Sequence, residues 1–196
     1  MPWARRVARW CGSDCLLGST ALRPSLTAPG WITITGSTIR DAHPHGVLSV
    51  AEVIQKSRNV GTVKMAMQMH PREMWETYAQ AGFGQKPQVP FPGAVPGRLR
   101  PYKTWRPIEQ ATMGYGYGIS VSALQLARAY TIFTNDGVLL PVTFLKRDGD
   151  VIGKQVISPK TAKTVAGMLE TVTQQGGTAK KGQVPGFRVA GKTGTA

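Results

Sequence analysis

The stretch from residue 82 to residue 118 contains six Pro and seven Gly. Proline fixes φ and removes a backbone donor, and glycine is unfavourable inside helices and strands, so no long regular element crosses this stretch. Loops of this length inside a compact domain are usually functional or disordered. The sequence therefore predicts two groups of short elements, one before and one after a long irregular connection.

The elements before the connection are short and carry clear start and stop signals. Residues 31–35 alternate apolar and polar side chains and, after a Gly-Ser turn, predict a small hairpin with residues 38–40. Ser49 with Glu52 three residues later has the pattern of a capping box. Capping residues and apolar spacing together predict helices at about 49–57, 60–69 and 71–81.

The elements after the connection follow the same pattern. Ser120 and Ser158 each precede apolar residues at helical spacing, and serine is a preferred helix N-cap. The prediction is a helix to about residue 135, a hairpin over 138–157, a helix to about residue 173 and a strand over 186–195. Residues 1–28 show no sustained period and are predicted to be irregular.

The charge is strongly basic, with 24 Lys and Arg against 10 Asp and Glu and a formal charge of +14. Nucleic-acid-binding proteins concentrate such charge in a patch with stacking aromatics. Beyond residue 30, adjacent basic pairs occur only at 146–147 and 180–181, with no aromatic residue beside either pair. A nucleic-acid partner is therefore not expected, whereas diffuse positive charge leaves binding to anionic polymers or phospholipid surfaces open.

Several other classes of protein are disfavoured. No run approaches the roughly 18 apolar residues that a membrane helix needs, and the basic first ten residues lack the apolar run of a secretory signal. Cys11 and Cys15 have no nearby His and do not form a zinc signature. Asp41, His43 and His45 alternate like metal ligands but are better explained as polar loop residues. Neither a metal nor another cofactor is expected.

Two short motifs have the residue types that chemistry needs. One is Ser57-Arg58-Asn59 at the junction of two predicted helices, and the other is Lys-Thr-Gly-Thr-Ala at 192–196 on the predicted last strand. Each alone is a weak signal: Ser-x-Asn occurs often by chance and Lys-Thr-Gly less often, and the first could be merely a helix end followed by a helix cap. Together, in this order and on these elements, they match the second and third motifs of penicillin-recognising serine enzymes.

Other segments extend this match over residues 29–196: IRDAH (39–43), VAEVIQKS (50–57), NVGT (59–62), YGISV (117–121), QLA (125–127) and VAGKTGTA (189–196). The chain resembles class B penicillin-binding proteins of the septal, cell-division type, which are peptidoglycan D,D-transpeptidases. The resemblance implies an α+β fold, the α/β sandwich of penicillin-recognising serine transpeptidases, here incomplete. It is expected to be mostly helical with a small hairpin and a terminal strand carrying Lys-Thr-Gly.

The resemblance also implies roles for individual residues. Ser57 and Lys192 are the expected catalytic pair, which relays a proton to the leaving group. Asn59 is expected to hydrogen-bond the acyl side chain of the substrate. Thr193 and Thr195 are expected to hold the terminal carboxylate together with the lysine, and the Thr195 N–H to donate to the oxyanion. At position 194, Gly would let the substrate approach the backbone closely.

The sequence departs from the family pattern in ways that affect activity. No Ser in the chain has a Lys three residues later, so the nucleophile motif S-x-x-K is absent, and Arg58 stands where septal members usually have Ser. Residues 1–28 resemble nothing in the family. Residues 29–196 are therefore expected to be a partial transpeptidase domain, without the nucleophile region and the C-terminal strands, that is inactive alone.

The expected partners are those of the family. In an intact parent they are peptidoglycan stem peptides ending in D-Ala-D-Ala and β-lactams, and the family is anchored in the inner membrane with a periplasmic catalytic domain. The alternative hypothesis is a non-catalytic binding or assembly module for membrane proteins of cell division. Residues 82–118 are the best candidate surface for that role.

Overall fold

The computed structural model describes residues 25–27, 30–89, 91–146 and 148–194. The α-helices in this part are α2 (Val50–Gln55), α3 (Asn59–Ala66), α4 (Pro71–Gln80), α5 (Pro107–Met113), α6 (Ala123–Thr134) and α7 (Pro159–Thr171). The 3-10 helices are η2 (Tyr102–Thr104) and η3 (Lys180–Gly182). The strands are β1 (Ser25–Thr27), β2 (Trp31–Ile34), β3 (Ser37–Arg40), β4 (Val47–Ser49), β5 (Val138–Leu139) and β6 (Lys154–Gln155).

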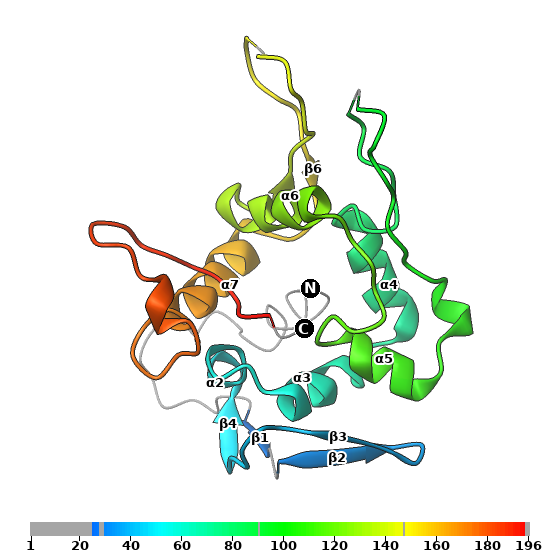
Figure 1. Ribbon diagram of the computed structural model, residues 1–196, viewed down its shortest axis with the longest axis vertical. Coiled ribbons are helices and arrows are strands. Elements are labelled where there is room, and N and C mark those ends of the chain that lie inside the picture. The colour runs from blue at the N-terminus through cyan, green and yellow to red at the C-terminus, as the bar shows by residue number, and fades with distance from the viewer. Residues whose placement is uncertain (1–24, 28–29, 90, 147, 195–196) are drawn as a thin grey trace.

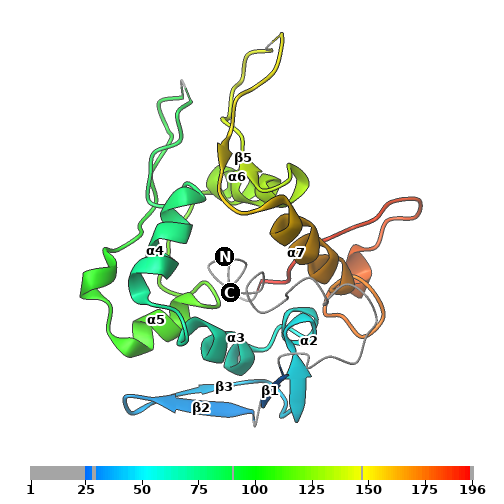
Figure 2. The ribbon, with the colours of Figure 1, turned by 180° about the vertical axis from the view of Figure 1, so that it is seen from behind.

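The helices follow one another around a ring in the order α2, α3, α5, α4, α6 and α7 (Figures 1 and 2). The strands form three two-stranded antiparallel sheets, β1–β4, β2–β3 and β5–β6. This confirms the predicted mixture of many helices with small hairpins. Within the described part of the chain, no helix has the length and apolar character that crossing a bilayer requires.

Local capping explains where several helices begin. Ser49 accepts a hydrogen bond from the Glu52 N–H, and the Glu52 carboxylate accepts one from the Ser49 N–H at 2.8 Å, as the sequence predicts. Ser158 is the N-cap of α7, where its hydroxyl accepts a hydrogen bond from the Thr161 N–H, and Pro159 follows it as the first residue of the helix. Pro71 occupies the first turn of α4, where its missing N–H costs nothing.

The start of α6 differs from the prediction. Ser122, and not Ser120, accepts a hydrogen bond from the Gln125 N–H and caps this helix. Ser120 instead pairs with Arg98 through two backbone hydrogen bonds of 2.7 and 3.1 Å. Ser122 is the cap because Gln125, three residues later, completes a capping box with it, whereas Ser120 has no such partner three residues later.

The long connection is less irregular than its composition predicts, because it contains η2 and α5. Pro107 lies in the first turn of α5, and the Glu109 carboxylate accepts a 2.8 Å hydrogen bond from the Arg106 N–H. Gln125 on α6 holds the earlier part of the connection by donating to the carbonyls of Gly82, Gln85 and Pro96. Counting Pro and Gly over the whole stretch hides a helical signal between Pro107 and Met113.

The predicted strand over 186–195 is wrong for the residues that the structure describes, since 183–194 contain no strand. Instead, the segment packs along the C-terminal part of α7. The Val189 carbonyl accepts a 2.8 Å hydrogen bond from the Thr173 hydroxyl, and the Gly191 N–H donates to the Leu169 carbonyl at 3.2 Å. Contacts to a helix thus satisfy backbone groups that a sheet was expected to pair.

Two further predictions need correction. The hairpin over 138–157 pairs only β5 with β6, so most of its predicted strand residues lie in an extended loop. Of the segment predicted to be irregular, residues 1–24 and 28 lie outside the described residues. Ser25–Thr27 form β1 and pair with β4, which supplies the partner strand that the local sequence does not reveal.

The main hydrophobic core lies among α2, α4, α6 and α7, and a smaller cluster lies between α3, α5 and the β2–β3 hairpin. Among the described residues, the most completely buried large side chains are Met74, Met113, Val53, Val60, Val63, Val165 and Val172. Methionines at 65, 69 and 74 are buried, whereas Met67 is 37% exposed. Methionine therefore serves mainly as adaptable core filling in this chain.

Candidate functional site

The two motifs come together in space although they are 135 residues apart in the sequence. The Lys192 ammonium donates a hydrogen bond of 2.5 Å to the Ser57 hydroxyl. Ser57 lies between α2 and α3, and Lys192 lies in the segment that follows η3. The same Nζ is 3.1 Å from the Thr193 carbonyl oxygen and 3.3 Å from its hydroxyl. A cation, two hydroxyls and a backbone carbonyl therefore share one small site.

Hydrogen bonds between α2 and the end of α7 explain why the motifs meet. The Gln55 side-chain amide, in the last turn of α2, donates to the carbonyls of Thr171 and Gln175 at 3.3 and 3.4 Å. Figure 1 shows the chain after η3, in red, looping outward beyond α7 and then returning past α7 into the middle of the ring. The C-terminal end of α7 and the residues just after it are thus the common support for both halves of the site.

An ion pair fastens the returning segment to α7. Arg188 donates to both carboxylate oxygens of Glu170, at 2.9 and 2.6 Å. The hydrogen bond to Arg188 lowers the pKa of the Glu170 carboxyl below its ordinary value. The geometry is bidentate, which fixes direction as well as distance, so the pair sets where the chain lies four residues before Lys192.

The backbone at Ser57 is unusual. Its φ of 54° lies in the left-handed region, which non-glycine residues rarely adopt. This conformation ends α2 sharply and lets α3 start two residues later. At Gly61, an added Cβ would lie only 2.5 Å from Val53 Cγ2, so the absence of a side chain permits the close packing of α3 on α2.

The first turn of α3 is capped from another part of the chain. Asp41 Oδ1, just after β3, accepts hydrogen bonds from the Asn59 N–H at 2.7 Å and the Val60 N–H at 3.2 Å. Arg58 is the N-cap residue by position but provides no side-chain cap. Asn59 is therefore the first residue of the helix and not its cap, which excludes the structural explanation that the sequence left open for this residue.

Burial by neighbouring atoms lowers the pKa of the Lys192 ammonium below its ordinary value, although part of the side chain remains exposed. A lysine with a lowered pKa gives up its proton more readily, and it still attracts anions while charged. The site can thus hold a carboxylate and move a proton through the Ser57 hydroxyl.

The other predicted site residues of the Lys-Thr-Gly-Thr-Ala motif are Thr193, Gly194 and Thr195. Thr193 shares a 2.9 Å hydrogen bond between hydroxyls with Thr178, which orients its side chain. Gly194 is exposed, and an added Cβ would meet no atom of the described residues within 4 Å, so no contact in that part of the chain requires a glycine there. Thr195 lies outside the described residues.

The Arg58 side chain is half-buried. Its Nη1 donates to the His43 carbonyl at 3.4 Å, so the side chain turns back towards the connection between β3 and β4. Burial, followed by the charge of Arg58, lowers the pKa of His45 in the same connection. Within the described ranges, no group of three or more His, Cys, Asp or Glu side chains could hold a metal ion.

The sequence does not predict the residues that support the site. It indicates only a polar loop residue or a metal ligand at Asp41, and no local signal marks this residue as a cap, because the helix that it caps begins 18 residues later. Gln55, Glu170 and Arg188 carry no local signal, because their partners are distant in the sequence.

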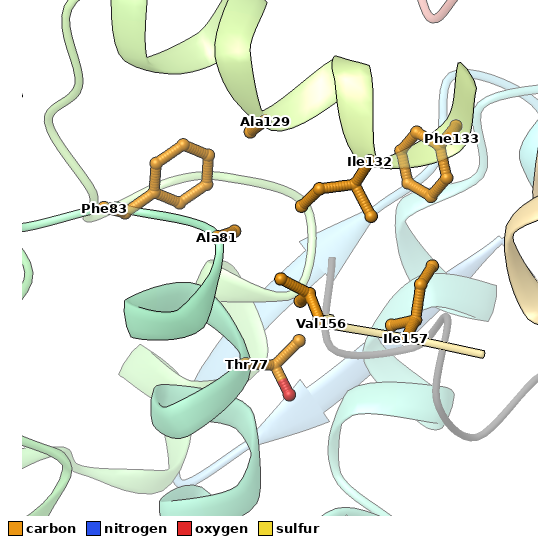
Figure 3. Close-up of a pocket in the computed structure, with 8 residues that line it drawn as sticks. All are labelled: Thr77, Ala81, Phe83, Ala129, Ile132, Phe133, Val156 and Ile157. Carbon is orange, nitrogen blue, oxygen red and sulfur yellow. The ribbon is translucent and has the colours of Figure 1, made fainter. Parts of the chain in front are cut away.

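A small apolar cavity of about 20 Å³ lies elsewhere, between α4, α6 and the residues before α7 (Figure 3). The eight side chains that line it include only one polar group, the hydroxyl of Thr77. None of them belongs to the two motifs. The cavity is therefore a packing defect of the core and not part of the candidate site.

The model of the penicillin binding protein transpeptidase domain matches residues 25–196. A probable peptidoglycan D,D-transpeptidase PenA from Neisseria meningitidis is 45% identical over 179 residues, which cover 91% of this chain and 31% of that protein. The peptidoglycan D,D-transpeptidase FtsI of Escherichia coli is 36% identical over 163 residues, covering 83% of this chain and 28% of that protein.

Solved structures agree with the sequence comparisons. A crystal structure of a peptidoglycan glycosyltransferase from Burkholderia ambifaria aligns with a TM-score of 0.85 at 52% identity, over 88% of this chain and 55% of that one. The apo TP domain of Burkholderia pseudomallei penicillin-binding protein 3 aligns with a TM-score of 0.84 at 50% identity, over 87% and 52%. The chain spans less than a third of the two curated relatives described above.

Proposed function

Because the chain belongs to the penicillin-binding protein transpeptidase family, we propose that it provides part of the active site of a peptidoglycan D,D-transpeptidase. The observation that carries the proposal is the hydrogen bond from Lys192 to Ser57 across 135 residues. It joins the second and third family motifs into one site whose groups suit a substrate carboxylate and a departing amine.

In the proposed reaction a serine hydroxyl attacks the carbonyl carbon of the D-Ala-D-Ala amide, and an acyl-enzyme ester forms as the C–N bond breaks. The hydroxyl loses its proton to a general base, and the departing amine gains one proton, so the number of protons is conserved. The departing amine needs a proton. Ser57 is proposed to deliver the proton from its hydroxyl and to be reprotonated by Lys192. The lowered pKa of Lys192 favours this transfer, because the lysine releases a proton more easily than usual.

Substrate binding is proposed for the other residues of the two motifs. Lys192 and the hydroxyls of Thr193 and Thr195 would hold the terminal carboxylate of a stem peptide, or the carboxylate of a β-lactam. The Asn59 side-chain amide would hydrogen-bond the acyl side chain, the Thr195 N–H would donate to the oxyanion, and Gly194 would admit the substrate close to the backbone.

The biological setting proposed for this activity is cross-linking of the cell wall during septation, in a periplasmic domain of an enzyme anchored in the inner membrane. The support is the likeness to relatives named as peptidoglycan D,D-transpeptidases. The partners would be peptidoglycan stem peptides, β-lactams and other membrane proteins of cell division.

The chain by itself is expected to form no covalent penicillin adduct. Its 196 residues contain no S-x-x-K, the motif that supplies the nucleophile in the proposed mechanism, and Ser57 is proposed to transfer a proton with Lys192. Intact mass spectrometry after incubation with benzylpenicillin is expected to show only the unmodified mass. An increase by the mass of one benzylpenicillin would refute the proposal that these residues bind without acylation.

A non-catalytic assembly module is the second candidate function, and one observation favours it. The loops over 84–98 and 140–153 extend beyond α4 and α6 (Figure 1) and expose large apolar side chains. Phe91 is 56% and Phe144 is 63% exposed, and their ring centroids are 6.2 Å apart. Exposed apolar groups that gather in this way are typical of protein interaction surfaces.

Under this alternative, the chain is expected to capture a membrane protein of cell division in a pull-down. Replacing Phe91 and Phe144 together with Ser is expected to abolish the capture, because both rings leave the shared surface. Trp31→Ser is the matched control, since Trp31 is 54% exposed but lies on β2. Equal capture by all variants would refute a role for the two loops.

A further inference from the structure

We propose that Asp41 is a positioning residue of the Ser57-Arg58-Asn59 motif. It holds the side chains of Ser57 and Asn59 in position relative to Lys192. The proposal rests on the transpeptidase site proposed above, because it assigns a support to that site. In the described structure the Asp41 side chain bonds the backbone N–H groups of Asn59 and Val60, so its effect has to pass through the backbone of α3.

The contacts of Asp41 are directed at the motif itself. One carboxylate oxygen, Oδ1, accepts from the backbone N–H groups of Asn59 and Val60, at 2.7 and 3.2 Å. The first N–H groups of a helix have no partner within the helix, and a carboxylate is the strongest neutral-pH acceptor for them. Since the side chain of Val60 is fully buried, water is poorly placed to replace Asp41 there.

The local backbone explains why this position needs an external support. Ser57 adopts a left-handed φ of 54°, a conformation that persists only where the surroundings impose it. Arg58 occupies the N-cap position, but its side chain does not cap the helix and instead donates a hydrogen bond from Nη1 to the His43 carbonyl. Ser57 is therefore held between α2 on one side and the α3 turn that Asp41 fixes on the other.

The β2–β3 hairpin gives Asp41 a fixed platform. Arg40, the last residue of β3, pairs with Trp31, and the Asp41 N–H donates to the Gly30 carbonyl at 2.8 Å. The chain thus anchors the backbone of Asp41 before its side chain reaches α3. Because the second carboxylate oxygen finds no donor among the described residues, the whole hydrogen-bonding role of the side chain is directed at Asn59 and Val60.

The test compares Asp41→Ala, Asp41→Asn and Ser158→Ala in the full chain. Alanine removes the acceptor, whereas asparagine keeps a carbonyl oxygen that can accept from the same N–H groups. Ser158→Ala is the matched control, because it removes the N-cap of α7 and should lower the melting temperature to a similar extent. Two readouts are used: the NMR titration of the Lys192 ε-carbon, and the affinity for benzylpenicillin.

Asp41→Ala is expected to shift the Lys192 titration and to weaken benzylpenicillin binding by roughly fivefold to tenfold. Asp41→Asn is expected to restore both readouts to within about twofold of the wild type, and Ser158→Ala to leave them unchanged despite its lower melting temperature. An unchanged Lys192 titration in Asp41→Ala, or an equal change in Ser158→Ala, would overturn the proposal.

The two readouts separate this inference from the proposed function. If the wild-type chain does not bind benzylpenicillin at all, the proposed function fails. The Lys192 titration needs no ligand, so it still decides whether Asp41 sets the position of the motif relative to the lysine.

Discussion

Replacing Lys192 with Ala is expected to weaken the binding of benzylpenicillin to this chain by about tenfold to a hundredfold. A hydrogen bond to a charged group contributes about 1.5–3 kcal/mol, and each 1.4 kcal/mol corresponds to about a factor of ten in the dissociation constant. Lys192 is the cation that lies beside both Ser57 and the Thr193 hydroxyl. Its loss would leave the β-lactam carboxylate with hydroxyl donors alone.

The measurement is a titration of each variant with benzylpenicillin, followed by calorimetry or NMR at constant ionic strength. Lys181→Ala is the matched control, because Lys181 lies on η3, just before the returning segment, and is exposed. It changes the net charge by the same amount and is expected to alter the affinity by less than about twofold. If both substitutions weaken binding equally, the general positive charge of the chain, and not the site, attracts the ligand.

The largest expected effect on stability follows from Met74→Ala. Met74 lies on α4, and its side chain is 0% exposed in the main hydrophobic core. Its truncation therefore removes buried apolar surface and leaves a cavity. The expected loss in the free energy of unfolding is about 2–5 kcal/mol. Urea denaturation followed by circular dichroism measures it.

Met67→Ala and Met74→Leu are the controls for this prediction. Met67 lies at the end of α3 and is 37% exposed, so its replacement is expected to cost less than about 0.5 kcal/mol. Met74→Leu nearly keeps the buried volume and is expected to cost less than about 1.5 kcal/mol. Similar losses for Met67→Ala and Met74→Ala would contradict the placement of the core.

Much of the fold follows from local signals. The capping residues Ser49 and Ser158, and Pro71 in the first turn of α4, mark helix starts that the structure confirms. Such signals act within one helical turn, so a single sequence is enough to find them. The β2–β3 hairpin is likewise confirmed, because alternation and a tight turn are local properties.

Contacts between distant segments limit what the sequence predicts. Residues 186–195 have the composition of a strand, but Val189 and Gly191 in this segment are hydrogen-bonded to Thr173, just after α7, and to Leu169 on α7. Helix α5 was hidden by the Pro and Gly around it, and its Glu109 is fixed by Arg100, nine residues earlier, as well as by its own first turn. Such pairings are decided by tertiary packing and not by propensity.

In the candidate site too, the residues of the two motifs could be predicted from the sequence, but the residues that support them could not. Ser57, Asn59 and Lys192 could be selected from residue types and spacing, together with the family resemblance. Their supports could not, because Asp41 acts over 18 residues and Gln55 over more than 100. Side chains that bind backbone groups of another segment leave no periodic pattern in the sequence.

The most direct test of the central claim is to map benzylpenicillin on the isotope-labelled chain by chemical shift changes. If Ser57 and Lys192 form one carboxylate-binding site, the largest changes are expected at Ser57, Asn59, Lys192 and Thr193, and they should disappear in Lys192→Ala. Changes confined to the apolar cavity or to the loops over 84–98 and 140–153, or none at saturating ligand, would contradict the claim.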